Sequence, residues 1–229
     1  MQPHTPTVAI VDYTLGNLFS VQNACEQVGL RAVVTSRKHE ILSAAGVILP
    51  GVGAFGDAMD NLRRLDLISP LRDIAQRDTP LIGVCLGQQL LMSESQEFGR
   101  HQGLGIFEGQ VIRFEGPRGA DGILKVPQVG WNRVIGKKET WTNTPLDGLP
   151  DGAFMYFVHS YHVQPARADV VLSTTRYGHI EFCSSLRRGN VVAFQFHPER
   201  SGRQGLRIYQ NLANLIAGRA ITQESAHAA

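Results

Sequence analysis

The segment Leu81-Ile82-Gly83-Val84-Cys85-Leu86-Gly87-Gln88-Gln89-Leu90 decides the fold. Its first four residues form a short apolar run typical of a buried strand, and residues 86 to about 95 have the pattern of a helix. A cysteine between two glycines at such a turn matches the G-x-nucleophile-x-G elbow of sheet-based hydrolases. The helix N-terminus behind it favours a thiolate. The alternative is a buried, unreactive cysteine beside two incidental glycines.

Upstream of this elbow, short apolar runs alternate with longer helical patterns. We predict strands at 8–11, 32–34, 46–49 and 81–84, and helices at 18–28, about 38–45 and 54–77. Pro70 is expected to break or kink the last of these helices. The order βαβαβαβα indicates a parallel sheet covered by helices. Cys25 falls on the apolar face of the first helix, so we expect it in the core.

The second half of the chain is rich in β-branched and aromatic residues, and it predicts strands at 106–114, 154–163, 170–175, 180–186 and 191–196. A final helix carries Leu206, Tyr209, Leu212 and Ile216 at helical spacing and ends at Gly218. The predicted fold class is therefore α/β, with a mostly parallel central sheet flanked by helices and a more antiparallel, β-rich second half. We expect a single domain over residues 1–229, with an ordered core at about 7–218 and a frayed tail at 219–229.

Composition argues against several classes of protein. The 22 basic and 20 acidic residues are scattered along the chain, so the net charge of +2 predicts no nucleic-acid partner. No apolar run reaches the roughly 18 residues of a membrane span, and the start lacks the pattern of a signal peptide. We therefore expect a cytoplasmic protein with no membrane contact. Three widely spaced cysteines suggest neither a disulfide framework nor a metal site.

A second chemical signal is the segment 196–199, Phe-His-Pro-Glu, at the end of an apolar strand. Strand alternation predicts that His197 and Glu199 lie on the same side, so that the carboxylate orients one imidazole nitrogen while the other faces Cys85. A cysteine nucleophile needs such a proton acceptor. An isolated histidine is more often structural. His159 is the main competitor, but no carboxylate stands two positions after it.

A third signal is the glycine-rich segment 49–56, LPGVGAFG. Gly51, Gly53 and Gly56 formally match the dinucleotide-binding pattern G-x-G-x-x-G. That pattern belongs after the first strand, with an acidic residue ending the next strand, whereas here two βα units precede it and the next strand ends in Cys85. We favour a turn at the carboxyl edge of the sheet that donates a backbone N–H to an oxyanion.

Taken together, PGVGAFGDAM (50–59), GVCLGQQLL (83–91) and FQFHPERSG (194–202) resemble the class I (triad) glutamine amidotransferase family, from about Val8 to Gly218. Gly16-Asn17 with Ser20-Val21, VPQVGWN (126–132) and YFVHSY (156–161) are similar, more narrowly, to its glutaminase subunits of imidazole glycerol phosphate synthase. Thr14 stands where the family usually has glycine, and Arg200 stands where many members have lysine. Neither departure touches the three candidate catalytic residues.

The resemblance implies a role for each matching residue. Cys85 would be the nucleophile, His197 the general base and then acid, and Glu199 the group that orients His197. The oxyanion would be bound by the backbone N–H groups of Leu86 and Val52, the latter after a peptide flip that the adjacent glycines permit. The residues that would bind glutamine are Gly51, Gly53, Gln89, Ser160 and Tyr161. For Gln88 and Gln89, a solvated position early in a helix is the alternative, and the resemblance favours Gln89 as the binding residue.

The resemblance also implies the partners. The substrate would be L-glutamine, and the released ammonia would pass to a (β/α)8-barrel cyclase subunit within a heterodimer. No metal and no cofactor are implied. The candidate interface residues are Asn17, Trp131, Asn132, Tyr156 and Arg200. A core position for Trp131 is the alternative. Rival functions are a related glutaminase, such as the one that feeds pyridoxal phosphate synthesis, a free-standing γ-glutamyl hydrolase, and a dinucleotide-binding module.

Overall fold

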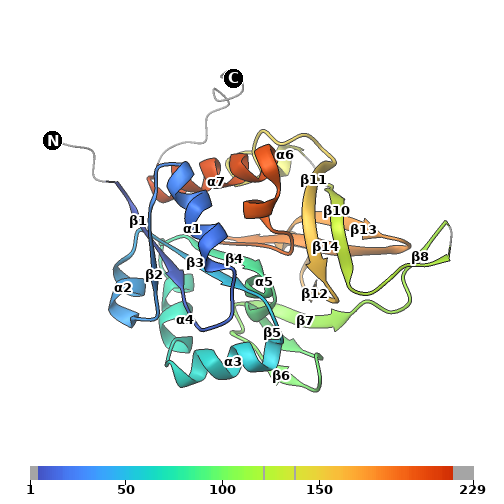
Figure 1. The fold of residues 1–229 in the computed structure, drawn as a ribbon, viewed down its shortest axis with the longest axis horizontal. Coiled ribbons are helices and arrows are strands. Elements are labelled where there is room, and N and C mark those ends of the chain that lie inside the picture. The colour runs from blue at the N-terminus through green and yellow to red at the C-terminus, as the bar shows by residue number, and fades with distance from the viewer. Residues whose placement is uncertain (1–4, 121, 137, 219–229) are drawn as a thin grey trace.

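The computed structural model describes residues 5–120, 122–136 and 138–218, and one large sheet runs through it (Figure 1). Five neighbouring strands of this sheet are parallel. In their order across the sheet they are β2 (Arg31–Thr35), β1 (Thr7–Val11), β3 (Gly46–Gly51), β4 (Leu81–Cys85) and β15 (Val191–Phe194). Because β4 lies between β3 and β15, the chain segments that follow these three strands meet at one edge of the sheet.

The sheet continues with strands from the second half of the chain. In order they are β14 (Ile180–Arg188), β12 (Tyr161–Pro165), β7 (Phe107–Arg113), β5 (Met92–Ser95) and β6 (His101–Gln102), and β13 (Val171–Tyr177) also pairs with β14. These pairings are antiparallel except for β5 with β7. Separate two-stranded sheets are formed by β10 (Gln128–Val134) with β11 (Ala153–His159), and by β8 (Arg118–Gly119) with β9 (Gly122–Ile123).

Helices cover both faces of the parallel strands (Figure 1). One face carries α1 (Leu18–Gln27) and α7 (Gly202–Ile216), and the other carries α2 (Lys38–Ser43), α3 (Phe55–Arg64), α4 (Ile68–Gln76) and α5 (Leu86–Leu90). The short helix α6 (Lys138–Trp141) precedes β11, and single 3-10 turns form η1 (Ala168–Val170) and η2 (Pro198–Arg200). The predicted fold class is confirmed.

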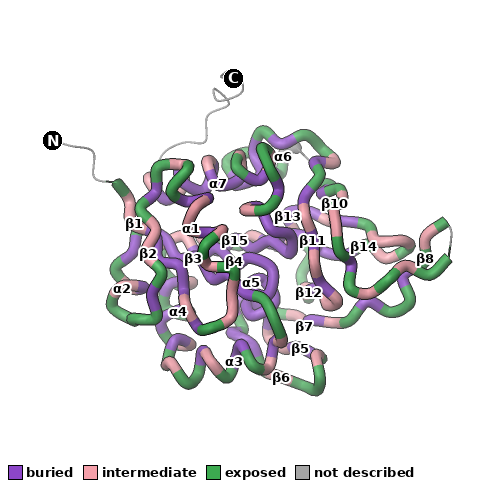
Figure 2. Tube along the Cα trace, viewed as in Figure 1, coloured by how far each residue is buried: buried purple, intermediate pink, exposed green. Residues whose placement is uncertain are grey.

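Strand alternation divides the core into two layers. In β1, Val8 and Ile10 pack on the α1 and α7 side, whereas Ala9 and Val11 pack on the opposite side. Cys25 is fully buried in the first of these layers, as predicted. Burial on both faces explains why these strands read as continuous apolar runs, and it appears as the purple central segments of Figure 2.

The predicted helix at 54–77 is two helices, and the break does not lie at Pro70. The chain turns between Arg64 and Ile68, where Asp66 has a positive φ of 53°. Pro70 lies in the first turn of α4, where backbone N–H groups need no partner within the helix, so its missing N–H costs little. The prediction of a break at Pro70 was therefore wrong.

Two other boundaries differ from expectation because strand pairing overrides local pattern. The helix after Cys85 ends at Leu90 rather than near Ser95, since Met92–Ser95 pairs in parallel with β7. The predicted strand at 154–163 is divided at Ser160 into β11 and β12, which belong to different sheets. This division brings Ser160 to a corner between the two sheets.

No helix within the described ranges is long and apolar enough to span a membrane. The tail at 219–229, for which fraying was predicted, lies outside the described residues.

Candidate active site

Cys85 occupies a sharp turn between β4 and α5. Its φ of 55° and ψ of −111° are rare for a residue with a side chain, and the helix begins at the next residue, Leu86. Such a conformation costs on the order of 1–3 kcal/mol and persists only where the surrounding structure enforces it. The predicted elbow is thus present as a strained turn, with the thiol at the carboxyl edge of the parallel strands.

The two glycines of the elbow allow very close backbone contacts. A Cβ atom at Gly87 would lie 1.8 Å from the carbonyl oxygen of Leu49, and one at Gly83 would lie 3.0 Å from the backbone of Gly87. Larger residues at either position would push α5 away from β3 and β4. The glycines therefore set how closely the first turn of α5 approaches the sheet.

His197 and Glu199 lie together, but not through strand alternation. Strand β15 ends at Phe194, and Glu199 belongs to the 3-10 turn η2 that begins at Pro198. This turn brings Oε1 of Glu199 to 2.7 Å from Nδ1 of His197. The predicted pairing is present, whereas the predicted route to it was wrong, because Pro198 starts a turn instead of continuing the strand.

Further bonds hold this turn in place. The N–H of His197 donates to the carbonyl of Tyr156 on β11 at 2.9 Å. The hydroxyl of Ser201 donates to the carbonyl of His197 at 2.6 Å and accepts from the N–H of Tyr156 at 3.0 Å. The imidazole is thereby fixed between the main sheet and the β10–β11 sheet.

The electrostatics of His197 favour its charged form. Burial by itself would lower the pKa of His197, but the neighbouring Cys85 and Glu199 outweigh that effect and raise the pKa to about 10. Nε2 of His197 is buried and makes no hydrogen bond of normal geometry to a described residue, yet the Cys85 side chain lies close enough to raise the pKa of His197 through both its charge and its hydrogen-bonding contact. An imidazolium beside Cys85 stabilises the thiolate, which is the nucleophilic form of cysteine.

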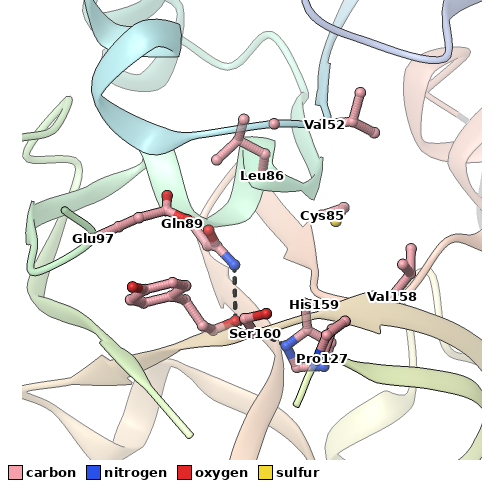
Figure 3. A pocket seen from close by; sticks show the side chains of 11 residues that line it. Val52, Cys85, Leu86, Gln89, Glu97, Pro127, Val158, His159 and Ser160 are labelled. Carbon is pink, nitrogen blue, oxygen red and sulfur yellow. Dashed lines mark hydrogen bonds between the residues drawn. The ribbon is translucent and has the colours of Figure 1, made fainter.

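A pocket of about 270 Å³ opens beside the Cys85 sulfur (Figure 3). Val52 and Leu86 lie on one side of Cys85, and His159 and Ser160 lie on the other. The other residues that line it are Gly53, Gln89, Glu97, Pro127, Val158 and Tyr161. The structure thus brings together seven residues predicted from sequence: Val52, Gly53, Cys85, Leu86, Gln89, Ser160 and Tyr161.

Gln89 is buried rather than solvated. Its Nε2 donates to the carbonyl of Tyr161 and to Oε1 of Gln195, each at 3.0 Å. The neighbouring Gln88 is also fully buried, and its amide has no hydrogen-bond partner in the described part of the chain. The alternative of a solvated helix start is therefore wrong for both glutamines, because α5 is covered by β3, β5 and β12.

The glycine-rich loop begins beside the elbow. Gly51 at the end of β3 pairs with Cys85 at the end of β4. Tyr13 donates its hydroxyl to the carbonyl of Pro50 at 2.7 Å, and a Cβ atom at Gly51 would lie 2.0 Å from that hydroxyl oxygen. The loop of Gly51, Val52 and Gly53 therefore leaves the sheet next to the thiol, with its first residue held under Tyr13.

Three residues of the site were missed by the sequence predictions, and a fourth, His159, was considered only as a rival base to His197. Gln195 is fully buried with Nε2 at 3.8 Å from the Cys85 sulfur, Glu97 and His159 line the pocket, and Tyr13 anchors the loop. Tyr13 and Gln195 each lie just after a parallel strand, so a rule that assigns ligands to the carboxyl ends of such strands identifies these two. Glu97 carries no comparable local signal.

His159 does not compete with His197 as a base. Its Nδ1 is 2.8 Å from the carbonyl of Tyr161, so the proton resides on Nδ1 and the ring is held in one tautomer. Burial lowers the pKa of His159 to about 3, which keeps the ring neutral.

The proposed interface residues mostly lie on an exposed face of the β10–β11 sheet and the adjoining turn η2. Trp131 is 56% exposed, and its ring packs edge-on against Tyr156, over which the guanidinium of Arg200 lies at 4.4 Å. The core alternative for Trp131 is therefore wrong, and the core tryptophan is Trp141. Asn17 is exposed at the start of α1, whereas Asn132 is half-buried and donates to the carbonyl of Arg176.

No group of His, Cys, Asp and Glu side chains suited to a metal ion is found among the residues that the structure describes.

Comparison with known proteins agrees with this geometry. The model of the family "Glutamine amidotransferase class-I" matches residues 9–214. "Imidazole glycerol phosphate synthase subunit HisH" of Moorella thermoacetica is 46% identical over 91% of this chain and 95% of its own length. The protein of the same name from Aquifex aeolicus is 49% identical over 88% of this chain and 93% of its own length.

Solved structures share the fold. The structure of PurLQS from Thermotoga maritima superposes with a TM-score of 0.69 at 18% identity, over 92% of this chain and 98% of that one. The glutaminase domain of Trypanosoma brucei CTPS, solved with bound acivicin, has a TM-score of 0.67 at 17% identity, over 97% and 98% of the two chains.

Proposed function

Since the chain belongs to the class I glutamine amidotransferase family, we propose that it is the glutaminase subunit of an imidazole glycerol phosphate synthase. It hydrolyses L-glutamine to glutamate and ammonia, and it passes the ammonia to a cyclase subunit in histidine biosynthesis. The observation that carries this proposal is that Cys85 lies on a strained elbow and lines the pocket, while the bonded pair His197 and Glu199 lies close enough to Cys85 for the thiol to raise the pKa of His197.

In the first half of the reaction, the Cys85 thiolate attacks the side-chain amide carbon of glutamine. The carbonyl oxygen takes up negative charge, which the backbone N–H groups of Leu86 and Val52 stabilise. The His197 imidazolium then protonates the leaving nitrogen, the C–N bond breaks, and ammonia leaves. A γ-glutamyl thioester remains on Cys85.

In the second half, neutral His197 accepts a proton from water. The resulting hydroxide attacks the thioester, the C–S bond breaks, and glutamate and the thiolate are released, with the imidazolium restored. Glu199 holds Nδ1 of His197 throughout, so that Nε2 faces the reacting atoms. Atoms and charge balance: glutamine and water yield glutamate, ammonia and the proton that the new carboxylic acid group releases.

The pocket accounts for recognition of the amino-acid end of glutamine. Glu97 is the one charged side chain among the residues that line the pocket, and its carboxylate suits the α-ammonium group. Gln89 stabilises the turn at Ser160 and Tyr161 by donating a hydrogen bond to the Tyr161 carbonyl. Gly51, Gly53, Ser160 and Tyr161 complete the proposed substrate-binding set.

The cyclase subunit is proposed to be a (β/α)8 barrel that binds the acceptor nucleotide. It is proposed to form a cytoplasmic heterodimer with this chain, and the assembled enzyme is proposed to have lyase activity. Ammonia released into water would be protonated and lost as a nucleophile, so direct transfer is needed. Trp131, Tyr156 and Arg200, with Asn17 and Asn132, are the proposed contact residues. The Gly51-Val52-Gly53 loop is proposed to complete the oxyanion site only when the cyclase is loaded.

The experiment that tests the function measures glutamate release from glutamine by the chain alone and with the cyclase subunit plus its nucleotide. We expect strong release only in the complete mixture, and its loss in Cys85→Ala. Cys183→Ala is the matched control, because Cys183 is a buried thiol on β14 that donates to the carbonyl of Ser185 away from the pocket. Equal release without the partner would refute coupled ammonia transfer, and activity in Cys85→Ala would refute the mechanism.

A further inference from the structure

Two buried oxygen atoms near the proposed triad lack hydrogen-bond partners among the described residues. They are Oε2 of Glu199 and the hydroxyl of Tyr209. The other oxygen of Glu199 already binds His197, so Oε2 is the free acceptor of this carboxylate. Buried polar atoms in folded proteins nearly always have partners, which makes two such oxygens in one part of the core informative.

Helix α7 carries Tyr209 and lies directly on the turn that carries Glu199. A Cβ atom at Gly205 would lie 1.8 Å from the carbonyl oxygen of Pro198, so the helix backbone touches this turn. Tyr209 is four residues after Gly205 and lies on the same face of the helix. Helical side chains lean toward the N-terminus, so the ring of Tyr209 leans back toward Pro198 and Glu199.

Gln204 and Arg207 on α7 also have buried polar atoms without hydrogen-bond partners, but neither is placed to bond the Tyr209 hydroxyl. Gln204 also has a buried oxygen without a partner, but it precedes Tyr209 by five residues and therefore lies roughly 140° away around the helix. Arg207 points toward Gly148, on the side away from η2.

The chemistry of the two groups is complementary. Burial, with smaller contributions from Glu199 and Cys25, raises the pKa of Tyr209 well above its ordinary value of 10. The phenol therefore keeps its proton, and it can donate. A carboxylate oxygen is the strongest acceptor that a neutral hydroxyl meets in a protein core.

We propose that the Tyr209 hydroxyl donates a hydrogen bond to one enclosed water molecule, which in turn donates to Oε2 of Glu199, and that this bridge holds the carboxylate in the orientation that binds His197. Tyr209 is then a positioning residue: it acts through Glu199 and His197 without touching glutamine or Cys85. This inference rests on the proposed function, since it assigns Tyr209 a part in the same reaction.

The test compares Tyr209→Phe with the unchanged chain in the complex with cyclase and nucleotide. We expect kcat for glutamine hydrolysis to fall roughly 3- to 10-fold, the size expected for one hydrogen bond, with KM unchanged. Tyr209→Leu should show the same loss of kcat. Tyr177→Phe is the matched control and should keep the kcat of the unchanged chain, because the Tyr177 hydroxyl bonds the carbonyl of Lys125, remote from Glu199. Thermal melting confirms that each variant is folded.

A double-mutant comparison separates positioning from general packing. In the Glu199→Ala background, Tyr209→Phe should cause no further loss of kcat, because the carboxylate is gone. Unchanged kcat in Tyr209→Phe, or an equal loss in both backgrounds, overturns the inference. If Cys85→Ala and Glu199→Ala lose activity while Tyr209→Phe does not, the inference alone fails. Full activity in Cys85→Ala or Glu199→Ala would refute the proposed function itself.

Discussion

Glu97 shows how a single side chain can be placed at the site by contacts far from its own position in sequence. Its carboxylate lines the pocket while accepting the N–H of Phe55 at 2.7 Å. Burial raises the pKa of Glu97, whereas the Phe55 N–H and His101 act in the opposite direction. An incoming ammonium group would favour the ionised form further.

We expect Glu97→Gln to raise KM for glutamine by roughly 10- to 100-fold, with kcat changed only a few-fold, since a hydrogen bond to a charged group contributes about 1.5–3 kcal/mol. Glutamine at position 97 keeps an acceptor for the Phe55 N–H but loses the charge. Steady-state kinetics of glutamate release in the complex measure this effect. Glu94→Gln is the control, because Glu94 pairs with Arg100 outside this pocket. A normal KM in Glu97→Gln would exclude the proposed role.

At the scale of elements, the ends of β3 and β4 and the segment after β1 surround the loop of Gly51, Val52 and Gly53, which is the proposed oxyanion loop. Tyr13 follows β1, and its hydroxyl lies over Gly51 at the end of β3. Because that hydroxyl holds the Pro50 carbonyl, peptide rotation is restricted to the bonds after Gly51. The loop thus has one fixed end and one adjustable end.

Gly51→Ala is expected to reduce the free energy of unfolding by about 1–3 kcal/mol, as overpacking typically does, and to reduce glutaminase activity. The new methyl group would lie 2.0 Å from the Tyr13 hydroxyl oxygen and 3.0 Å from Cβ of Leu86. Adding Tyr13→Phe removes that oxygen and should recover part of the lost stability, as measured by urea unfolding. Tyr13→Phe alone is the control, and it should cost about 1 kcal/mol through loss of the bond to Pro50. A double variant no more stable than Gly51→Ala would contradict the predicted clash.

At the scale of the whole molecule, buried neutral histidines make stability depend on pH. His159 has a pKa lowered to about 3 by burial, and burial also lowers the pKa of His162. In the unfolded chain these side chains bind protons below about pH 6.5. The unfolded state therefore holds more protons between about pH 6.5 and 3, and stability falls as the pH falls through this range.

We expect His159→Gln to weaken this dependence, which for one histidine is at most about 1.4 kcal/mol per pH unit. Urea unfolding at pH 7 and pH 5 measures the change in the free energy of unfolding. His162 should account for part of the pH dependence that remains in His159→Gln. His39→Gln is the control, because His39 is exposed on α2. Equal losses of stability on acidification in the unchanged chain and in His159→Gln would rule out His159 as a source.

The exposed face of the β10–β11 sheet is the expected docking surface. Val129, Trp131 and Phe154 lie there with exposures of 60%, 56% and 47%. We expect Trp131→Ala to weaken binding of the cyclase by about 10-fold or more, because aromatic side chains dominate interface energies. Titration calorimetry measures the Kd. Val34→Thr is the control, because Val34 lies on β2, the edge strand of the separate large sheet. An unaltered Kd in Trp131→Ala would place the interface elsewhere.

Local sequence determined the first half of the fold and the chemical motifs. Apolar runs with helical segments between them predicted β1, β3, β4 and α1, because buried parallel strands and amphipathic helices have distinct periods. The elbow at Cys85 was predictable because close backbone contacts and a strained turn require glycines beside the nucleophile. The pair His197 and Glu199 was predictable from spacing alone, although the turn that joins them was not.

Only the tertiary structure decided which distant residues complete the site. Gln89 and Gln195 are 106 positions apart, yet their side chains bond beside Cys85, and Glu97 enters the pocket from the segment between β5 and β6. The division at Ser160, which separates β11 from β12, arises because the two strands find partners in different sheets. Strand pairing and packing are long-range interactions whose energies exceed local preference, so no pattern within a single segment specifies them.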